Sequence, residues 1–205
     1  MKKEKISILI TNFNKEKFLD ECIQSCLNQN YENLEIIIID NLSTDNSLNI
    51  IEKYSNKLLI KTRKRNSIYG PKNQIDSLIE AFNYSKGEII LLLDSDDYIQ
   101  INKVSKIINI FDNNKNVDVI FDIPNILNKG ISEALKIKKK FNNKIWPTII
   151  PTSGISLRRI FFESCLKSSL FKDYPTLEVD FRINFFSRKI LNNYKIIHEN
   201  LSFYR

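Results

Sequence analysis

Apolar residues follow two periods that alternate along the first half of the chain. Four continuous runs have the length of buried strands, at residues 6–10, 34–39, 57–62 and 88–93. Three segments between and after them carry apolar residues at helical spacing, at residues 16–27, 48–54 and 75–82. This alternation predicts an α/β fold, with a mostly parallel central sheet flanked by helices on both faces.

Punctuating residues support these boundaries. Ser43, Thr44 and Asp45 precede the second helical segment, and their side chains can accept hydrogen bonds from a helix start. Gly70-Pro71 indicates a loop before the third helix, and Gly87 is expected to be the C′ glycine that ends it.

The second half of the chain is less regular. The expected elements are a helix at 104–111, a strand at 117–121, helices at 157–165 and 177–190, and a last strand at 194–197. A loop is expected at 142–151. Because no linker or internal repeat interrupts the chain, we expect one domain over residues 1–205.

Composition narrows the class of protein. Hydrophobic residues make up 42% and charged residues 27% of the 205 residues, which is typical of a globular chain and argues against disorder. The net charge of +7 suits phosphate-bearing substrates, anionic lipid or nucleic acid. Basic residues are spread along the chain, and the densest run, at 136–140, is interpreted as a solvated helix face or a specific basic patch.

No stretch approaches the roughly 18 apolar residues of a membrane span, and the basic start leads into a short strand rather than a signal peptide. We therefore expect a cytoplasmic protein. The chain has three cysteines, which make no disulfide framework. Cys22 and Cys26 share a helix face, and we interpret them either as a metal or redox pair or as two small buried residues. A single histidine, His198, excludes a multi-histidine metal site.

Polar clusters follow three of the apolar strands, at residues 11–14, 40–45 and 94–97. Ligands of open parallel sheets bind outside the carboxyl ends of the strands, so these clusters predict a site at one sheet edge. The chain has four glycines and neither a GxGxxG fingerprint nor a P-loop, so a phosphate group needs another clamp. Asp94 and Asp96 can share Mg²⁺ or Mn²⁺ with diphosphate oxygens, or they can belong to an acidic turn that caps the next helix.

Four segments in the first hundred residues resemble motifs of family 2 glycosyltransferases, which have the GT-A fold. The segments are SILITNFNKEKFL at 7–19, SCLNQNY at 25–31, EIIIIDNLSTDNS at 35–47 and SKGEIILLLDSDD at 85–97. The resemblance implies a nucleotide-diphosphate-sugar donor, with a nucleotide-binding half at 1–100 and an acceptor half at 101–205. It also implies a divalent cation, Mn²⁺ or Mg²⁺.

Residue roles follow from the resemblance in the same way. Asp40 is expected to contact the base, and Asp94 and Ser95 to lie near the ribose. Asp96, with Asp94, is expected to bind the metal, and Asp97 either caps a helix or acts directly. The remaining donor-site residues implied are Thr11, Asn12, Phe13 and Lys72, the last as a cation beside the donor phosphates.

The chain departs from the family pattern at three positions of the nucleotide segments. Asn41 replaces an Asp, Leu42 replaces a Gly, and Thr11 replaces a Pro. Leu42 predicts an ordinary backbone conformation, since only glycine adopts positive φ freely.

On the acceptor side, inverting transfer needs one general base. Glu178 matches the family position of the base, and Asp180 lies two residues on, so only one of them is expected to point into the site; acids favoured by a helix dipole are the other interpretation. Residues 151–156 are either an acceptor or phosphate loop or a plain turn, and Trp146 either stacks on a sugar or belongs to the core.

The family often has a metal-binding histidine beyond a Tyr-Arg pair. The sequence ends at Tyr204-Arg205, which we interpret as a truncated or a minimal domain, with His198 in a structural role.

We therefore predict a metal-dependent, inverting glycosyltransferase of cell-surface polysaccharide or lipo-oligosaccharide synthesis, with a UDP-sugar donor. The acceptor is expected to be a glycan or a lipid-linked molecule, with peripheral contact to the inner face of the membrane and no nucleic-acid partner. The alternatives are an inactive nucleotide-sugar-binding module and, more distantly, a sugar nucleotidyltransferase.

Overall fold

A central mixed sheet of seven strands organises the protein. The computed structural model describes residues 4–128, 131–134 and 148–205. In spatial order the strands are β10 (Tyr194–Ile197), β6 (Val119–Asp122), β9 (Ile155–Arg158), β4 (Ile89–Asp94), β1 (Ile6–Asn12), β2 (Leu34–Asp40) and β3 (Leu59–Thr62). Strand β9 runs antiparallel to both of its neighbours, and the other pairs are parallel. The predicted α/β class and mostly parallel sheet are confirmed.

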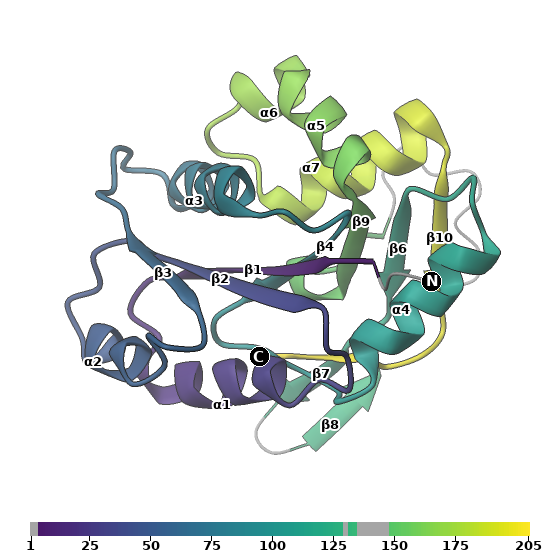
Figure 1. Cartoon of the computed structure of the whole chain (residues 1–205). Coiled ribbons are helices and arrows are strands. Elements are labelled where there is room, and N and C mark those ends of the chain that lie inside the picture. Colours follow the sequence, from purple (N-terminus) through teal and green to yellow (C-terminus); the bar gives the residue numbers. More distant parts are fainter. Residues whose placement is uncertain (1–3, 129–130, 135–147) are drawn as a thin grey trace.

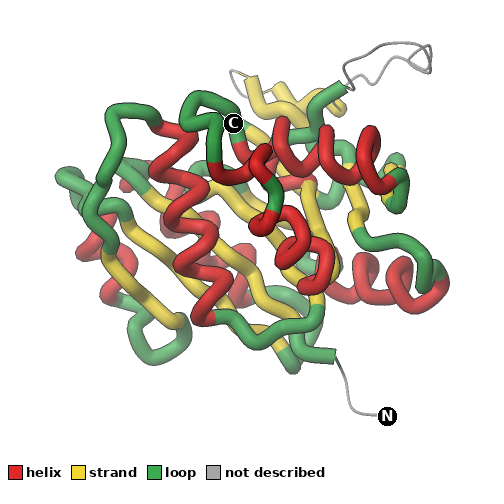
Figure 2. The backbone as a smooth tube through the Cα atoms, turned by 90° about the horizontal axis from the view of Figure 1, so that it is seen from above, coloured by secondary structure: helices red, strands yellow, loops and turns green. Residues whose placement is uncertain are grey.

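Helices cover both faces of this sheet (Figure 1). One face carries α1 (Glu16–Leu27), α2 (Ser47–Glu52) and α4 (Lys103–Asn113). The other carries α3 (Gly70–Tyr84), α5 (Arg159–Lys167), α6 (Ser169–Lys172) and α7 (Val179–Phe185), which lie above the strands in Figure 2. A π-helical turn, η2 (Phe186–Leu191), continues α7.

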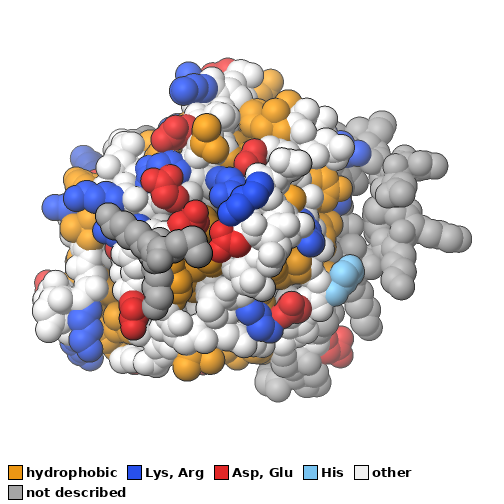
Figure 3. Space-filling model, turned by 45° about the vertical axis from the view of Figure 1, so that its right-hand side comes forward, with side chains coloured by type: hydrophobic (Ala, Val, Ile, Leu, Met, Phe, Trp, Pro, Cys, Tyr) orange, Lys and Arg blue, Asp and Glu red, His pale blue; other side chains and the backbone are white. Residues whose placement is uncertain are grey.

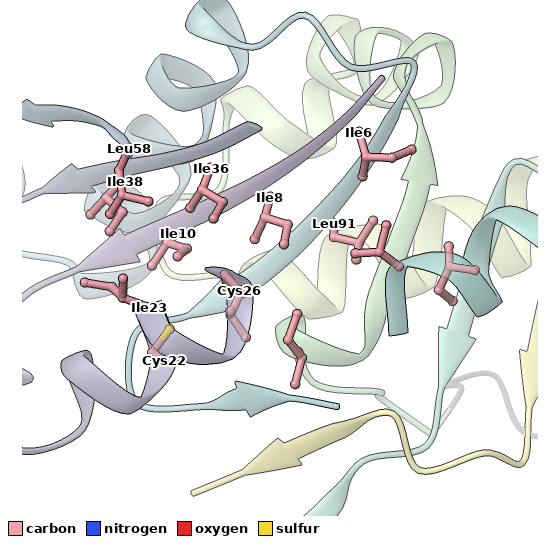
Figure 4. Close-up of a cluster of buried hydrophobic side chains, with 14 of the residues drawn as sticks. Ile6, Ile8, Ile10, Cys22, Ile23, Cys26, Ile36, Ile38, Leu58 and Leu91 are labelled. Atoms are coloured by element: carbon pink, nitrogen blue, oxygen red, sulfur yellow. The ribbon is translucent and has the colours of Figure 1, made fainter. Parts of the chain in front are cut away.

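Alternate residues of each central strand pack into the hydrophobic cores on opposite faces of the sheet. The sequences of these strands are therefore continuously apolar. Ile8 and Ile10 of β1 pack towards α1, whereas Leu9 belongs to the core beneath α3. Cys22 and Cys26 of α1 are fully buried in the first of these cores (Figure 4). The interpretation of this pair as small buried residues is therefore confirmed.

A second sheet of four short strands lies beside α1 and α4. Its order is β5 (Tyr98–Ile99), β11 (Ser202–Tyr204), β7 (Asn125–Asn128) and β8 (Ile131–Ala134). None of these strands was predicted, because two to four residues are too short to show a period. Through β11 this sheet brings residues near position 204 against the segment that follows β4.

Three sequence expectations need correction. The helix predicted at 157–165 begins only at Arg159, because Leu157 and Arg158 end strand β9. Gly70-Pro71 forms the first turn of α3. Proline is tolerated there, because the backbone N–H groups of the first turn have no partner within the helix. Helix α3 ends at Tyr84, and Gly87 serves close packing, since a Cβ there would lie 2.5 Å from the Ser7 amide nitrogen.

Surface charge is mixed on the face shown in Figure 3, where Lys and Arg side chains are interspersed with Asp and Glu. The basic run at 136–140 and Trp146 lie outside the described residues, as does most of the loop expected at 142–151. Among the described residues, no helix combines the length and the apolar character that crossing a bilayer requires.

Candidate functional site

A pocket of about 320 Å³ lies at the carboxyl edge of the central sheet. The ends of β1, β2 and β4 and the loops that follow them form it, together with the start of α3. The segment between β3 and α3 contributes Arg65, and the end of β11 contributes Tyr204 and the following Arg205. The lining residues are Thr11, Asn12, Phe13, Lys15, Asn41, Arg65, Gly70, Asn73, Gln74, Asp94, Ser95, Asp96, Tyr204 and Arg205.

Strand register brings the predicted polar clusters together. Thr11 lies opposite Asp94 in the β1–β4 pair, and Asn12 lies opposite Asp40 in the β1–β2 pair. Because the three strands are parallel and adjacent, their carboxyl ends meet at one edge. The predicted convergence of these clusters is confirmed.

Asp40 lies beneath the pocket and does not line it. Its side chain is fully buried and accepts hydrogen bonds from Asn12 Nδ2 (2.6 Å), Ser43 N (2.8 Å) and Ser43 Oγ (2.7 Å). The next residue, Asn41, lines the pocket, and its Oδ1 accepts a hydrogen bond from Ser77 Oγ (2.8 Å). Asp40 therefore holds Asn12 in place, and Asn41 is the residue of this strand end that faces a ligand.

Leu42 does not have the ordinary backbone that its side chain predicted. Its φ is +52°, in the left-handed region, and 47% of its surface is exposed. The loop keeps the turn for which the family uses glycine, so the expectation from residue type was wrong. Asn14, on the facing loop, has the same φ and accepts a hydrogen bond from Thr44 N (2.8 Å).

The same loop caps two helices. Asp45 accepts hydrogen bonds from Ser47 N at the start of α2 and from Glu16 N at the start of α1, each 3.0 Å long. The predicted capping by this segment is confirmed for Asp45. Its two hydrogen bonds also connect the loop after β2 to the loop after β1.

The acidic loop after β4, residues 94–97, borders the pocket. Asp94 accepts a hydrogen bond from Gln74 Nε2 (2.7 Å), and Asp96 is paired with Lys15 Nζ (2.5 Å). Ser95 is buried and lines the pocket between them. Burial, and then the negative charges of Asp97 and Asp96, raise the pKa of Asp94 to about 8.

Asp97 supports this loop and does not line the pocket. It is fully buried, and its carboxylate accepts hydrogen bonds from Ser153 Oγ (2.5 Å) and Arg205 N (2.9 Å). Burial raises the pKa of Asp97 to about 6, against the opposing effect of these two hydrogen bonds.

The donor set of the loop fits a hard divalent cation that shares its coordination with a ligand. Two carboxyl groups, Asp94 and Asp96, lie at the pocket, and the mutual repulsion of the acids is a charge imbalance that a cation relieves. The described residues contain no group of three or more His, Cys, Asp or Glu that could hold a metal by itself. A cation held by Asp94 and Asp96 would therefore need further ligands from outside this set.

The cations of the pocket differ from the one that was predicted. Lys72 does not line the pocket and is paired with Asp76, one turn further along α3. Lys15, Arg65 and Arg205 line it instead. No periodic pattern marks these residues in the sequence, although Lys15 directly follows the first polar cluster.

Aromatic rings hold two of these cations. The Arg65 guanidinium lies 4.0 Å from the ring centroid of Phe13. Arg205 lies 4.8 Å from the Phe18 ring and 5.0 Å from the Tyr98 ring, and it donates a hydrogen bond to the Asp96 carbonyl oxygen (2.7 Å). From the sequence, no role in the pocket was expected for Tyr204 and Arg205. The structure places both residues in the pocket wall.

The two candidate bases lie at the start of α7, and neither lines the pocket. The charge of Asp180 is felt at both Asp94 and Tyr204, where it contributes to a raised pKa. Burial raises the pKa of Asp180 itself to about 6. Glu178 is exposed, and burial raises its pKa against the opposing charge of Arg182. The charge of Asp180 thus acts on the acidic loop, whereas the charge of Glu178 interacts with Arg182 and Asp180.

Residues 151–156 do not line the pocket. They contain a buried 3-10 turn, η1 (Thr152–Gly154), and the first residues of β9. His198 is exposed after β10, away from the pocket lining.

A mixed α/β sheet with an acidic loop and a ligand-sized pocket at its strand ends defines the GT-A class of fold. The family model "Glycosyl transferase family 2" matches residues 7–167, so the chain belongs to this family. The predicted family and GT-A fold are confirmed.

Several relatives agree with this assignment. The "Uncharacterized glycosyltransferase alr2836" of Nostoc sp. is 28% identical over 98% of this chain and 64% of its own length. An uncharacterized glycosyltransferase of Haemophilus influenzae is 39% identical over 51% of this chain and 41% of its own length. "Poly(ribitol-phosphate) beta-N-acetylglucosaminyltransferase TarS" of Staphylococcus aureus is 26% identical over 72% of this chain and 27% of its own length. The chain thus spans less than two thirds of each of these relatives.

Solved structures show the same fold. TarS 1–349 of S. aureus, in complex with UDP, superposes with a TM-score of 0.72 at 23% identity, over 97% of this chain and 60% of that one. A mannosyltransferase of Pyrobaculum calidifontis, in complex with GDP-Man and Mn²⁺, superposes with a TM-score of 0.67 at 15% identity, over 97% of this chain and 55% of that one.

Proposed function

We propose that the protein transfers a sugar from a nucleotide-diphosphate-sugar to a hydroxyl group of a glycan or lipid-linked acceptor, with inversion at the anomeric carbon. The observation that carries this proposal is the pocket itself. Paired carboxyl groups of Asp94 and Asp96 lie in it beside three cations, Lys15, Arg65 and Arg205. A diphosphate needs this combination, because the cations attract its oxygens and the carboxylates attract its counterion.

The nucleoside is expected to bind on the β1–β2 side of the pocket. Asn41 borders this space, with its side chain held by Ser77 and by the Asn12 carbonyl oxygen, while Asp40 holds the Asn12 side chain. Phe13, with Arg65 stacked on it, offers an aromatic surface there. UDP is the nucleotide that we favour, because the related TarS structure contains it.

The leaving group is stabilised at the acidic loop. Asp94 and Asp96 are the residues that would hold Mg²⁺ or Mn²⁺, which when bound neutralises negative charge on the departing diphosphate. Lys15 and Arg205 lie beside the same loop and contribute further positive charge. Their position supports departure of a nucleoside diphosphate as the bond from the sugar C1 breaks.

Asp180 is the better placed of the two candidate bases. As the acceptor hydroxyl oxygen bonds to the sugar C1, the hydroxyl proton has to pass to a carboxylate on the side away from the leaving group. The charge of Asp180 raises the pKa of Asp94 and of Tyr204, and its own pKa of about 6 leaves it ionised at neutral pH and able to accept the proton. This ranking reverses the one that the family resemblance favoured, which was Glu178.

The acceptor class follows from relatives alone. TarS is named for transfer of N-acetylglucosamine to poly(ribitol-phosphate). We therefore propose a role in cell-surface polysaccharide synthesis. The family assignment leaves the inactive binding module as the competing function, because such a module would keep the pocket and lose transfer.

Calorimetric titration tests the donor site. UDP, GDP, CDP and their sugars are titrated in Mn²⁺ and in chelator. We expect one nucleotide to bind at least tenfold more tightly in Mn²⁺, and Asp96→Ala to remove this difference. Asp112→Ala, at an exposed acid of α4, is the matched control and keeps it. Metal-independent binding by the unaltered protein would contradict the proposed metal site.

Transfer to a mixed glycan acceptor pool, followed by NMR of the anomeric configuration, tests turnover and inversion. Asp180→Asn should keep nucleotide affinity and lose at least 100-fold in rate, whereas Glu178→Gln should retain most of the activity. The opposite result would return the base to Glu178. No transfer by the unaltered protein, with intact nucleotide binding, would favour the inactive module.

A further inference from the structure

A fully buried polar cluster lies directly behind the acidic loop. Lys103, the first residue of α4, has no exposed surface. Its Nζ donates to Asp122 Oδ1 (2.6 Å), to the Ser153 carbonyl oxygen (2.7 Å) and to Ser202 Oγ (2.7 Å). All three donor positions of the ammonium group are therefore used. We call Lys103, Asp122, Ser153 and Ser202 the Lys103 cluster.

The cluster joins four elements that are distant in sequence. Lys103 belongs to α4, Asp122 ends β6, Ser153 lies in η1 and Ser202 begins β11. The Ser202 hydroxyl lies 2.5 Å from Asp122 Oδ2 and 2.7 Å from the Ser153 carbonyl oxygen. The two residues after Phe203, which follows Ser202, are the pocket residues Tyr204 and Arg205.

Ser153 connects the cluster to the acidic loop. Its carbonyl oxygen faces Lys103, whereas its hydroxyl donates to Asp97 Oδ2 (2.5 Å) and accepts from the Asp94 amide nitrogen (3.1 Å). Gly154 allows η1 to lie close to the end of β6, because a Cβ at that position would lie 2.6 Å from the Asp122 carbonyl oxygen. The backbone of one proposed metal ligand is thus tied, through one residue, to a buried ion pair.

We propose that the Lys103 cluster is a positioning device, which sets the acidic loop through Ser153 and the Tyr204–Arg205 wall through Ser202 at the spacing that a metal–diphosphate complex requires. This inference rests on the proposed function. Buried ion pairs seldom add more stability than apolar side chains of the same volume. The contribution of this cluster is the relative position of the elements, since each of its hydrogen bonds holds two of them in one arrangement.

Positional accuracy matters at this place because the ligand set is incomplete. With two carboxyl groups from the protein, the loop and the donor phosphates have to present their oxygens to one ion together. Mg²⁺ tolerates little departure from octahedral geometry, and productive sites are held to within about 0.5 Å. A small displacement of Asp94 is therefore expected to weaken metal-linked binding more than nucleotide binding itself.

Ser153→Ala tests the proposal, because it deletes the hydroxyl that contacts Asp94 and Asp97 and leaves the ion pair intact. Ser156→Ala is the matched control. Ser156 is equally buried and belongs to β9, and its hydroxyl has no hydrogen-bond partner within the described part of the chain. UDP affinity is measured by calorimetry in Mn²⁺ and in chelator, with the Mn²⁺ EPR spectrum of the UDP complex as a second readout.

We expect Ser153→Ala to weaken UDP binding about tenfold in Mn²⁺, to leave affinity in chelator unchanged, and to broaden the Mn²⁺ EPR lines. Ser156→Ala should match the unaltered protein in all three. Equal loss with and without Mn²⁺, or no loss, would overturn the proposal. If Ser153→Ala fails to fold, Ser202→Ala, which removes the link to β11, is judged by the same criteria.

Absence of metal-linked binding of UDP, GDP and CDP alike in the unaltered protein would instead overturn the proposed function. The two failures are therefore distinguishable, since one concerns the unaltered protein and the other only the comparison between variants.

Discussion

Replacement of Lys103 by methionine is expected to destabilise the protein strongly. The change removes an ammonium group with no exposed surface and the three hydrogen bonds that it donates. It leaves the Asp122 carboxylate fully buried, with Ser202 as its remaining partner. Removing one partner of a buried pair costs about 3–5 kcal/mol, because the other charge stays uncompensated. Against a total stability of about 5–15 kcal/mol, this loss is large and still measurable.

The assay is urea unfolding, with a double-mutant cycle. Lys103→Met, Asp122→Asn and the double variant are compared by their free energies of unfolding. We expect the double variant to be less destabilised than Lys103→Met alone, with a coupling energy of about 2 kcal/mol or more. The double variant loses the charges together, so no buried ion remains unpaired.

A loss below about 1 kcal/mol for Lys103→Met would refute this reasoning, since it would mean that water or a moved side chain solvates Asp122. Additive single effects would refute it as well. Lys115→Met, at an exposed ion pair of the same helix region, is the control and should change stability by less than about 1 kcal/mol.

Three further predictions follow from single positions. Leu42→Gly should raise stability by up to about 1 kcal/mol in urea unfolding, because relief of the left-handed strain of about 1–2 kcal/mol exceeds the entropy cost of glycine; a loss would contradict the strain. Gly154→Ala should lower it by about 1–3 kcal/mol, since the added methyl meets a backbone carbonyl at 2.6 Å; unchanged stability would show that η1 moves freely. Lys15→Met should strengthen Mn²⁺ binding to the donor-free protein severalfold by EPR titration, because Lys15 no longer competes for Asp96; weaker Mn²⁺ binding would contradict this.

Periodicity alone predicted the first half of the fold. Helix α1 has the bounds predicted for it, at 16–27, and the strands before and after it were placed to within two residues. These elements have seven to twelve residues and face either two cores or one, so their hydrophobic period reports burial directly. The polar strand ends located the pocket for the same reason, since parallel neighbours end at one edge.

Tertiary structure decided which side chains face that pocket. Asp40 and Asn41 are adjacent polar residues and both are buried, and only the packed loop shows that Asn41 borders the pocket and Asp40 does not. Lys72 and Arg65 are both cations near α3, and an ion pair with Asp76 holds Lys72 outside the pocket. Leu42 adopts a glycine-like φ because hydrogen bonds around it hold the turn.

Contacts between distant segments lie beyond any local pattern. Strand β9 is too short to show a period, and β11 pairs with β5 about a hundred positions away in sequence, so neither was visible before the chain folded. Lys103, Asp122, Ser153 and Ser202 meet for the same reason. The sequence by itself determined strands β1 to β4 of the sheet and the edge at which the pocket lies, because burial leaves a local period. The orientation of each side chain at that edge was decided only by tertiary packing, because it depends on neighbours from other parts of the chain.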